Sequence, residues 1–358
     1  MEVKHSLRFL KHRFFYIALI VVNAFLVYGI RYRRYFERTA ASQWARHKAN
    51  REIVAQARGV DAVLTLGSLQ ENPTDGKDGV RHAIVIDHVN LLSKKIPDFG
   101  IPFPEREVSA SWNEFERRAL HSQDRIFVLS NFVKGSIVDD YGIDPEKVTV
   151  IGAGPNLDVD SKRDGITKDF NGRNILFVGL DPVRKGLPLL LKAFESVVKV
   201  FPDAHLNVVG VEGQNRQGVT YHGRLHGDAL KRMFYESQVF AMPSLREPFG
   251  IVFLEAMWSQ NVCIGTNAFT MPEIIEHGVT GYVVNPQDEV ELADRLVTLF
   301  SNPDQLKQMA EEGYRKAQSK WSWDVSARIV GESLFPGVER PAVDLISESP
   351  PAETSQSR

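Results

Sequence analysis

The sequence predicts an α/β protein made of two consecutive Rossmann-like units, each a parallel sheet covered by helices. Short apolar runs typical of buried strands alternate with longer segments of helical composition. The alternation occurs twice, and a polar stretch with two glycines, residues 158–173, separates the two series. Unusual glycines and charged residues follow the predicted strands, at the edge where open α/β sheets bind ligands. We therefore expect two domains that face each other across a ligand-binding cleft.

The first series predicts a domain over residues 59–160. A polar-faced helix at 36–57 precedes it, and prolines and a glycine break the chain at 97–104. The predicted strands are 61–66, 81–86, 125–129 and 148–151, and the predicted helices are 111–121 and 132–141.

The second series predicts a domain over residues 172–320. A crossing helix at 321–335 and a tail at 336–358, which is rich in Pro, Ser and Glu and expected to be disordered, follow it. The predicted strands are 174–178, 205–209, 219–222, 238–242 and 262–265, with a turn and a strand over 278–283. The predicted helices are 187–200, 228–237, 290–300 and 303–318.

The composition is that of a globular protein, with 358 residues, 43% hydrophobic and 25% charged. The single cysteine, Cys263, excludes a disulfide framework, and its apolar surroundings predict a buried thiol rather than a nucleophile. The net charge of -2 points to no particular partner, and we expect no nucleic acid.

Residues 1–58 form a basic amino-terminal segment that contains an uncharged apolar run at 14–30, flanked by Lys and Arg. The run is near the lower length limit for a membrane-spanning helix. It is interpreted either as a buried or interfacial helix or as an anchoring helix. The expected location is therefore the cytoplasm, with membrane association through residues 14–30 as the open alternative.

Two carboxylates, Glu247 and Glu255, bracket the predicted start of a helix that follows the strand at 238–242. Pro248 is typical of a first helical turn. The N–H groups of Phe249, Gly250 and Ile251 would then point outward and bind an anion. A phosphate site between two carboxylates suits a ligand that is part phosphate and part polyhydroxyl, which describes a nucleotide sugar.

Two cations, Arg184 and Lys185, follow the strand at 174–178 and precede a helix. An isolated Arg-Lys pair is most often solvated. In the same half of the chain as Glu247 and Glu255, the pair is expected to neutralise a diphosphate leaving group.

Taken together, these motifs resemble the retaining glycosyltransferases of family 4, which have the GT-B fold. The resemblance is dense over residues 172–330 and looser over 60–160. It rests on Phe-Val-Gly at 177–179, Arg-Lys-Gly at 184–186, Met-Pro-Ser at 242–244, Glu-Pro-Phe-Gly at 247–250, Glu-Ala at 255–256, Met-Pro-Glu-Ile at 271–274, Gly-Val-Thr-Gly at 278–281 and Trp-Ser-Trp at 321–323.

The resemblance implies a metal-independent transfer of a sugar, without a cofactor, from a nucleoside-diphosphate sugar to a glycan, lipid or small-molecule acceptor. It implies that Glu247 holds the hydroxyls of the donor sugar and Glu255 those of the ribose. Lys185, with Arg184, would bind the diphosphate. The remaining donor contacts would come from Gly179, the backbone of Phe249, Gly250 and Ile251, and the loops that carry Gly210, Gly223 and Arg224.

The chain departs from the family pattern in three ways. Leu180 stands where the family often has an arginine. No strand with a glycine-rich loop precedes Asp61, so the first domain is either shortened or replaced there by the 14–30 segment. The family's first-domain histidine near the sugar has no unambiguous counterpart, and Asp87 and His88, at the end of the strand at 81–86, are the candidates for its catalytic role, with a capping or core role as the alternative. These departures leave open a non-catalytic nucleotide-sugar-binding or assembly protein. A dehydrogenase is disfavoured, because no strand leads into Gly-x-Gly-x-x-Gly.

Overall fold

The computed structural model describes residues 42, 44–45, 48–49, 51–52, 59–66, 71–72, 79–96 and 110–337. The predictions for residues 14–30 and for the tail from 338 onward lie outside these residues. Within them, no helix has the length and apolar character that crossing a membrane requires.

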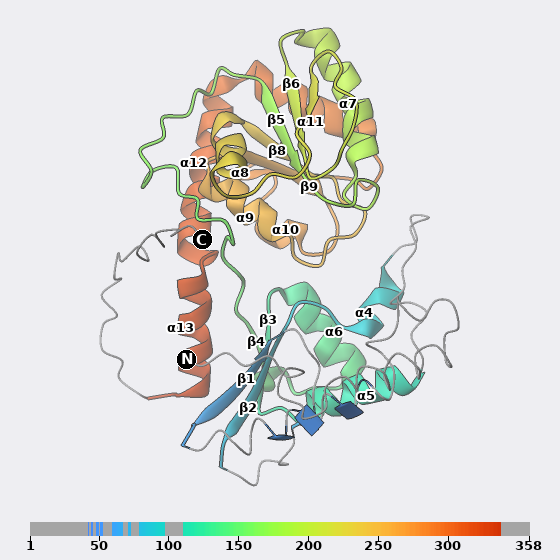
Figure 1. The fold of residues 1–358 in the computed structure, drawn as a ribbon, viewed down its shortest axis with the longest axis vertical. Coiled ribbons are helices and arrows are strands. Elements are labelled where there is room, and N and C mark those ends of the chain that lie inside the picture. The colour runs from blue at the N-terminus through green and yellow to red at the C-terminus, as the bar shows by residue number, and fades with distance from the viewer. Residues whose placement is uncertain are drawn as a thin grey trace, which may run out of the picture.

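The first domain contains a four-stranded parallel sheet in the order β1-β2-β3-β4 (Figure 1). Its apolar residues Ile84, Ile126 and Val128 pack with Tyr141 into a core of their own. Asn131 begins the helix that follows β3, where Ser130 accepts a capping hydrogen bond from the Val133 N–H at 3.3 Å. The elements are β1 (Ala62–Leu66), β2 (Arg81–Ile86), α4 (Asn90–Lys95), α5 (Ala110–His121), β3 (Arg125–Val128), α6 (Asn131–Tyr141), the 3-10 helix η5 (Pro145–Lys147) and β4 (Val148–Val150).

The second domain contains a six-stranded parallel sheet in the order β10-β9-β8-β5-β6-β7. From β5 the chain builds outward through β6 and β7, then returns to the other side of β5 and continues through β8, β9 and β10. The elements are β5 (Asn174–Val178), α7 (Leu187–Val200), β6 (His205–Val209), β7 (Val219–Tyr221), α8 (Gly227–Glu236), β8 (Val239–Ala241), α9 (Ile251–Trp258), β9 (Val262–Thr266), α10 (Met271–Ile274), β10 (Gly281–Val284), α11 (Glu289–Ser301) and α12 (Pro303–Lys320).

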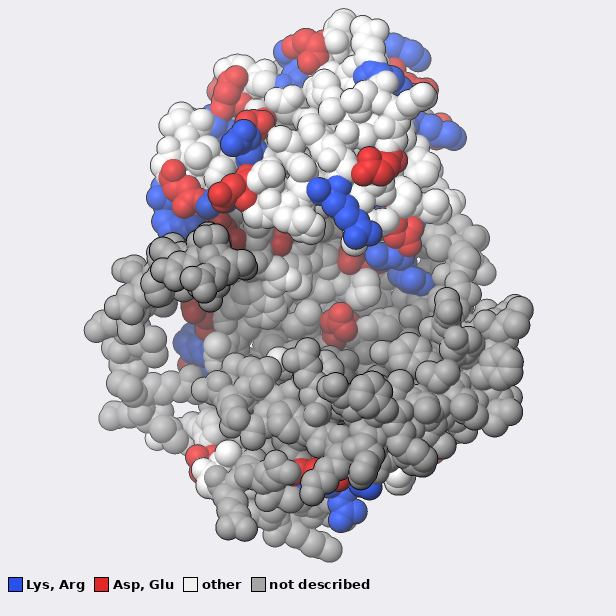
Figure 2. Space-filling model, viewed as in Figure 1, with Lys and Arg blue, Asp and Glu red and all other residues white. Residues whose placement is uncertain are grey.

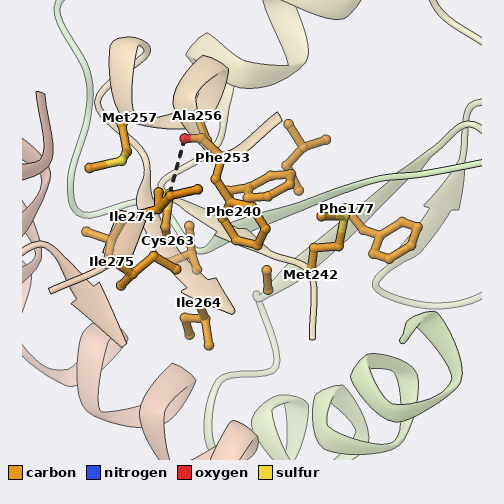
Figure 3. Packing of buried hydrophobic residues seen from close by; sticks show 14 of the residues in the cluster. Phe177, Phe240, Met242, Phe253, Ala256, Met257, Cys263, Ile264, Ile274 and Ile275 are labelled. Atoms are coloured by element: carbon orange, nitrogen blue, oxygen red, sulfur yellow. Dashed lines mark hydrogen bonds between the residues drawn. The ribbon is translucent and has the colours of Figure 1, made fainter. Parts of the chain in front are cut away.

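Helices cover both faces of this sheet, with α7 against α11 and α9 against α12 (Figure 1). Strands β8 and β9 are buried along their whole length, as expected for a parallel sheet covered on both sides. The predicted burial of Cys263 is confirmed: its thiol lies on the face of the sheet that packs against Phe253, and its Sγ lies 3.7 Å from the Phe253 carbonyl oxygen (Figure 3). Burial raises the pKa of this thiol well above its usual range, which disfavours a nucleophilic role.

The chain passes twice between the domains, once after β4 and once at the start of α13 (Trp323–Leu334), which then runs beside the first domain (Figure 1). The two passages touch: Trp323 Nε1 donates to the Pro155 carbonyl at 3.0 Å, and Ser326 Oγ donates to the Ile151 carbonyl at 2.9 Å. A Cβ on Gly154 would lie 2.4 Å from the Trp323 nitrogen, so only glycine permits this approach. Residues 152–157 and 321–323 therefore form the connection between the domains, which is called the hinge below.

The polar segment at 158–173 packs against the second domain. Asp160 accepts a hydrogen bond from the Tyr314 hydroxyl at 2.7 Å, and Lys231 pairs with Asp164 at 2.6 Å. The buried Lys168 Nζ donates to the Ser237 carbonyl at 2.6 Å. These contacts fix the segment to the second domain, so the hinge lies before it.

Candidate functional site

The strand order of the second domain reverses between β5 and β8, which are neighbours in the sheet. Parallel sheets bind ligands in the crevice beyond the carboxyl ends of such a strand pair, because the loops that follow them diverge. The loop after β5 carries Arg184 and Lys185, and the loop after β8 carries Glu247. The topology thus brings together side chains that the sequence separates by about sixty residues.

The loop after β5 is held against the loop after β8 by backbone contacts. The Leu245 N–H donates to the Arg184 carbonyl at 2.8 Å. Gly186 has a φ of 78°, and a Cβ there would lie 2.0 Å from the Pro243 carbonyl oxygen. A glycine is therefore required at 186, and its close approach to Pro243 places Lys185 directly beside the loop that carries Glu247.

The Lys185 ammonium makes a direct ion pair with the Glu247 carboxylate. Arg184 Nη1 lies 3.9 Å from the same carboxylate and donates to the Arg246 carbonyl at 2.9 Å. Asp181 lies 3.5 Å from Arg184 Nε and orients that guanidinium. The Lys185 and Glu247 side chains are only 13% and 8% exposed, so solvent screens their attraction weakly. The grouping of Arg184, Lys185 and Glu247 predicted from the motifs is thus present as one cluster.

Helix α9 begins at Ile251 and not near Pro248, so the expectation that Pro248 lies in the first helical turn is wrong. Gly250 precedes the helix with a φ of 87°, a conformation that glycine adopts readily and that keeps residues 247–250 irregular. No hydrogen bond between described residues uses the N–H groups of Phe249, Gly250 or Ile251. They remain suited to an anion at the helix amino terminus.

Glu255 is buried in the middle of α9 and contacts the hinge. Its Oε1 accepts hydrogen bonds from the N–H groups of Leu157 at 3.1 Å and Asn156 at 3.3 Å. Burial raises the pKa of the Glu255 carboxyl above its usual value, and the two backbone hydrogen bonds partly offset this effect. These partners, absent from the sequence prediction, engage one oxygen and leave Oε2 without a partner among the described residues.

The loops after β6 and β7 pack against each other and against the loop after β5, which carries Lys185. Gly210 has a φ of 105°, and its N–H donates to the Gly223 carbonyl at 2.7 Å. A Cβ on Gly210 would lie 2.4 Å from the Gly179 carbonyl oxygen, so the loops that carry these three glycines lie backbone against backbone. Arg224 follows Gly223 in the loop after β7, and it is exposed.

The first-domain candidates, Asp87 and His88, share no polar contact with the cluster. His88 Nε2 hydrogen-bonds Ser93 Oγ within its own domain at 2.5 Å, and Asp87 is exposed at the end of β2. Neither is among the polar contacts of Lys185 or Glu247. Their catalytic assignment therefore stays a prediction.

Over the described ranges, no three His, Cys, Asp or Glu side chains are grouped as metal ligands would be. Charges of both signs are mixed over the described surface of the second domain on the face in Figure 2.

Comparison with solved structures defines the class of fold. A glycosyltransferase from Rickettsia africae superposes with a TM-score of 0.63 at 18% identity, covering 84% of this chain and 83% of that one. Sucrose-phosphate synthase from Thermosynechococcus elongatus superposes with a TM-score of 0.61 at 17% identity, covering 81% and 77%. The protein has the two-domain GT-B architecture of these glycosyltransferases, as the sequence predicts.

Sequence comparison gives a narrower likeness. Residues 158–316 match the family described as "Glycosyl transferases group 1". The chain is 26% identical to a D-inositol 3-phosphate glycosyltransferase of Corynebacterium kroppenstedtii, over 60% of this chain and 53% of that protein. It is 32% identical to a phosphatidyl-myo-inositol mannosyltransferase of Mycobacterium leprae, over 44% of each. The chain therefore spans about half the length of these relatives, and the residues that match the family model lie in the part of the chain that carries the cluster.

Proposed function

We propose that the protein is a retaining glycosyltransferase of family 4 that moves a sugar from a nucleoside-diphosphate sugar to an acceptor hydroxyl. The grouping of Arg184, Lys185 and Glu247 at the switch point of the second-domain sheet carries the proposal. The family match over residues 158–316 supports it, because that range contains all three residues.

In the proposed reaction, the bond between the anomeric carbon and the diphosphate oxygen breaks. A bond between that carbon and the acceptor oxygen forms on the same face of the sugar. The departing diphosphate oxygen takes the acceptor proton, so atoms and charge balance without a further base. Negative charge grows on the diphosphate as its bond breaks, and Lys185, Arg184 and the amino end of α9 would stabilise it without a metal or other cofactor.

Two carboxylates would orient the donor. Glu247 would accept hydrogen bonds from sugar hydroxyls once a diphosphate draws Lys185 toward itself. Glu255 would accept the ribose hydroxyls through Oε2, while its Oε1 stays bonded to Leu157 and Asn156. Gly179, Gly210 and Gly223 would let the nucleoside approach the backbone closely.

The acceptor is proposed as a glycan, lipid or small polyhydroxyl molecule. Two relatives are named for inositol derivatives, which supports this class. For a lipid acceptor, the basic segment around residues 14–30 would hold a cytoplasmic enzyme at the membrane surface.

A thermal-shift screen of nucleoside diphosphates and their sugars, followed by a transfer assay with detection of the product's anomeric configuration, tests the proposal. A ligand at a hundred times its Kd should stabilise the protein by about 2.7 kcal/mol. Absence of both stabilisation and transfer across the common bases would contradict the proposal. Stabilisation without transfer or hydrolysis would favour the non-catalytic nucleotide-sugar-binding alternative.

A further inference from the structure

A carboxylate of the second domain binds the start of a first-domain helix. Glu273, in α10, accepts hydrogen bonds at 2.8 Å from the N–H groups of both Asn131 and Phe132. The Asn131 side-chain amide adds a third at 3.0 Å. In Figure 1, α10 lies next to the first turn of α6. Glu273 thus joins the two domains at a place remote from the hinge in sequence.

The chemistry at this contact is complementary. Asn131 and Phe132 are the first residues of α6, whose opening N–H groups have no acceptor within the helix. Ser130 caps the Val133 N–H and leaves the first two N–H groups to Glu273. The helix dipole favours a negative charge at this end, so the carboxylate meets both hydrogen-bond donors and a favourable field.

An aromatic contact supports the same junction. The rings of Phe132 and Phe269 lie 6.0 Å apart at 77°, an edge-to-face arrangement. Phe269 has a φ of 58°, a backbone conformation that bulky residues rarely adopt. Such a conformation persists only where the surroundings hold it, and here it points an aromatic ring at the first domain.

The segment that carries Glu273 also touches the candidate donor loop. Thr270 Oγ1 donates to the Pro248 carbonyl at 2.6 Å. The Met271 side chain packs over Gly250, where a Cβ would lie 3.0 Å from Met271 Cε. Residues 269–273 therefore contact the Glu247–Gly250 loop on one side and α6 on the other.

We propose that Glu273 is a positioning residue that sets how the first domain closes over the donor loop. By holding the amino end of α6, which follows the carboxyl end of β3, it fixes the acceptor-side domain relative to Glu247 and Gly250. The predicted effect of Glu273 on catalysis rests on the proposed function. Its predicted effect on the placement of the two domains does not. Loss of Glu273 should impair transfer while leaving nucleoside-diphosphate binding intact.

The geometric test measures the distance between spin labels on Asp139→Cys in α6 and Ser196→Cys in α7, both exposed positions. The native Cys263 is buried and will not take the label. Glu273→Ala and Glu273→Gln should broaden the distance distribution toward longer values. Glu276→Ala, an exposed acid three residues further on, should leave it unchanged. Identical distributions for wild type and both Glu273 variants would overturn the proposal.

A second variant guards against simple misfolding. Asn131→Asp places a negative charge against Glu273, yet an acid at this position favours α6 itself. Asn131→Asp should lengthen the distance between the two labels. The double variant Asn131→Asp, Glu273→Gln should recover part of that change in distance, because the repulsion between the two carboxylates is removed. If the changes in distance caused by the two substitutions simply add in the double variant, positions 131 and 273 are not directly coupled.

The kinetic test separates this inference from the proposed function. With Glu273→Gln, the Kd of nucleoside diphosphate, measured by calorimetry, should be unchanged. The kcat for transfer should fall on the order of tenfold, within the usual range of coupling effects. An equal loss of nucleotide affinity would indicate a structural defect and overturn the positioning role. A wild-type protein without binding or transfer would overturn the proposed function, while the label distances would still decide the role of Glu273 in closure.

Discussion

The ammonium of Lys185 and the carboxylate of Glu247 form a direct ion pair between the loops that follow β5 and β8. Each is the nearest charged partner of the other, and Arg184 adds a second cation 3.9 Å from the carboxylate. A diphosphate would compete with Glu247 for Lys185, and a sugar hydroxyl would compete with Lys185 for Glu247. Donor binding would therefore exchange the ion pair for contacts of each side chain with the donor.

Replacing Glu247 with Gln should abolish most transfer, with a loss on the order of a hundredfold or more in kcat if Glu247 acts in the transition state. Gln keeps the shape and one acceptor oxygen. Ala would leave Lys185 as a cation without its carboxylate at a position where its side chain is only 13% exposed, and removing one partner of a fully buried pair typically costs about 3–5 kcal/mol. Transfer rates measured beside circular dichroism melts separate the two effects. Wild-type transfer by a folded Glu247→Gln protein would refute the role assigned to Glu247.

Replacing Lys185 with Ala should raise the donor KM or lower kcat, because the diphosphate loses a cation where its charge develops. Removal of one such contact in a protected site costs on the order of a hundredfold. Lys192→Ala provides the matched control, since Lys192 lies on the adjoining helix α7 with its side chain 68% exposed. The test compares the KM and kcat of the two variants with the best donor from the screen. Equal values for both variants would show that Lys185 does not bind the diphosphate.

Gly186→Ala should destabilise the protein much more than Gly142→Ala. Both glycines have left-handed backbones, with φ values of 78° and 67°. Each substitution therefore carries a conformational cost of about 1–2 kcal/mol. Only at 186 would the new Cβ also collide with the Pro243 carbonyl, whereas nothing lies within 4 Å at 142. Chemical denaturation measures the difference, and equal losses would show that the contact between the two loops relaxes easily.

Much of the fold and part of the site follow from the sequence, because local patterns determine them. Apolar runs predict the strands, and the motifs at 184–186 and 247–250 fall beside the switch point where parallel sheets bind ligands. The beginning of α9 could not be predicted, because proline at 248 and glycine at 250 favour different boundaries and the left-handed Gly250 decides.

Contacts between distant segments were not predictable from one sequence. The bonds from Asn156 and Leu157 to Glu255 join residues about a hundred positions apart. The hydrogen bond from the Asn131 N–H to Glu273 joins residues 142 positions apart. No local propensity encodes such pairs, since they depend on how the two domains meet. The sequence therefore predicts which residues could bind a nucleotide sugar better than it predicts how the domains close around it.

Glu255→Gln should make the protein more stable at neutral pH, and the gain should shrink as the pH falls. Burial raises the pKa of the folded Glu255 carboxyl above the value of 4.5 expected when unfolded. Between these two pKa values the folded state holds more protons than the unfolded state, so the free energy of unfolding decreases as pH rises. Above both, the wild type carries the full cost of a buried carboxylate, whereas Gln is neutral and its oxygen can still accept the N–H groups of Asn156 and Leu157.

Thermal melts of both proteins at about pH 7.5 and about pH 4.5 measure this difference. Glu289→Gln on the surface of α11 is the control and should change little at either pH. A wild type more stable than Glu255→Gln at neutral pH would show that the two hinge hydrogen bonds outweigh burial. If Glu255 also holds the ribose, the same variant should bind nucleoside diphosphate more weakly, by about tenfold for one hydrogen bond to a charged group. Greater stability with weaker binding is expected for a carboxylate buried for function rather than for folding.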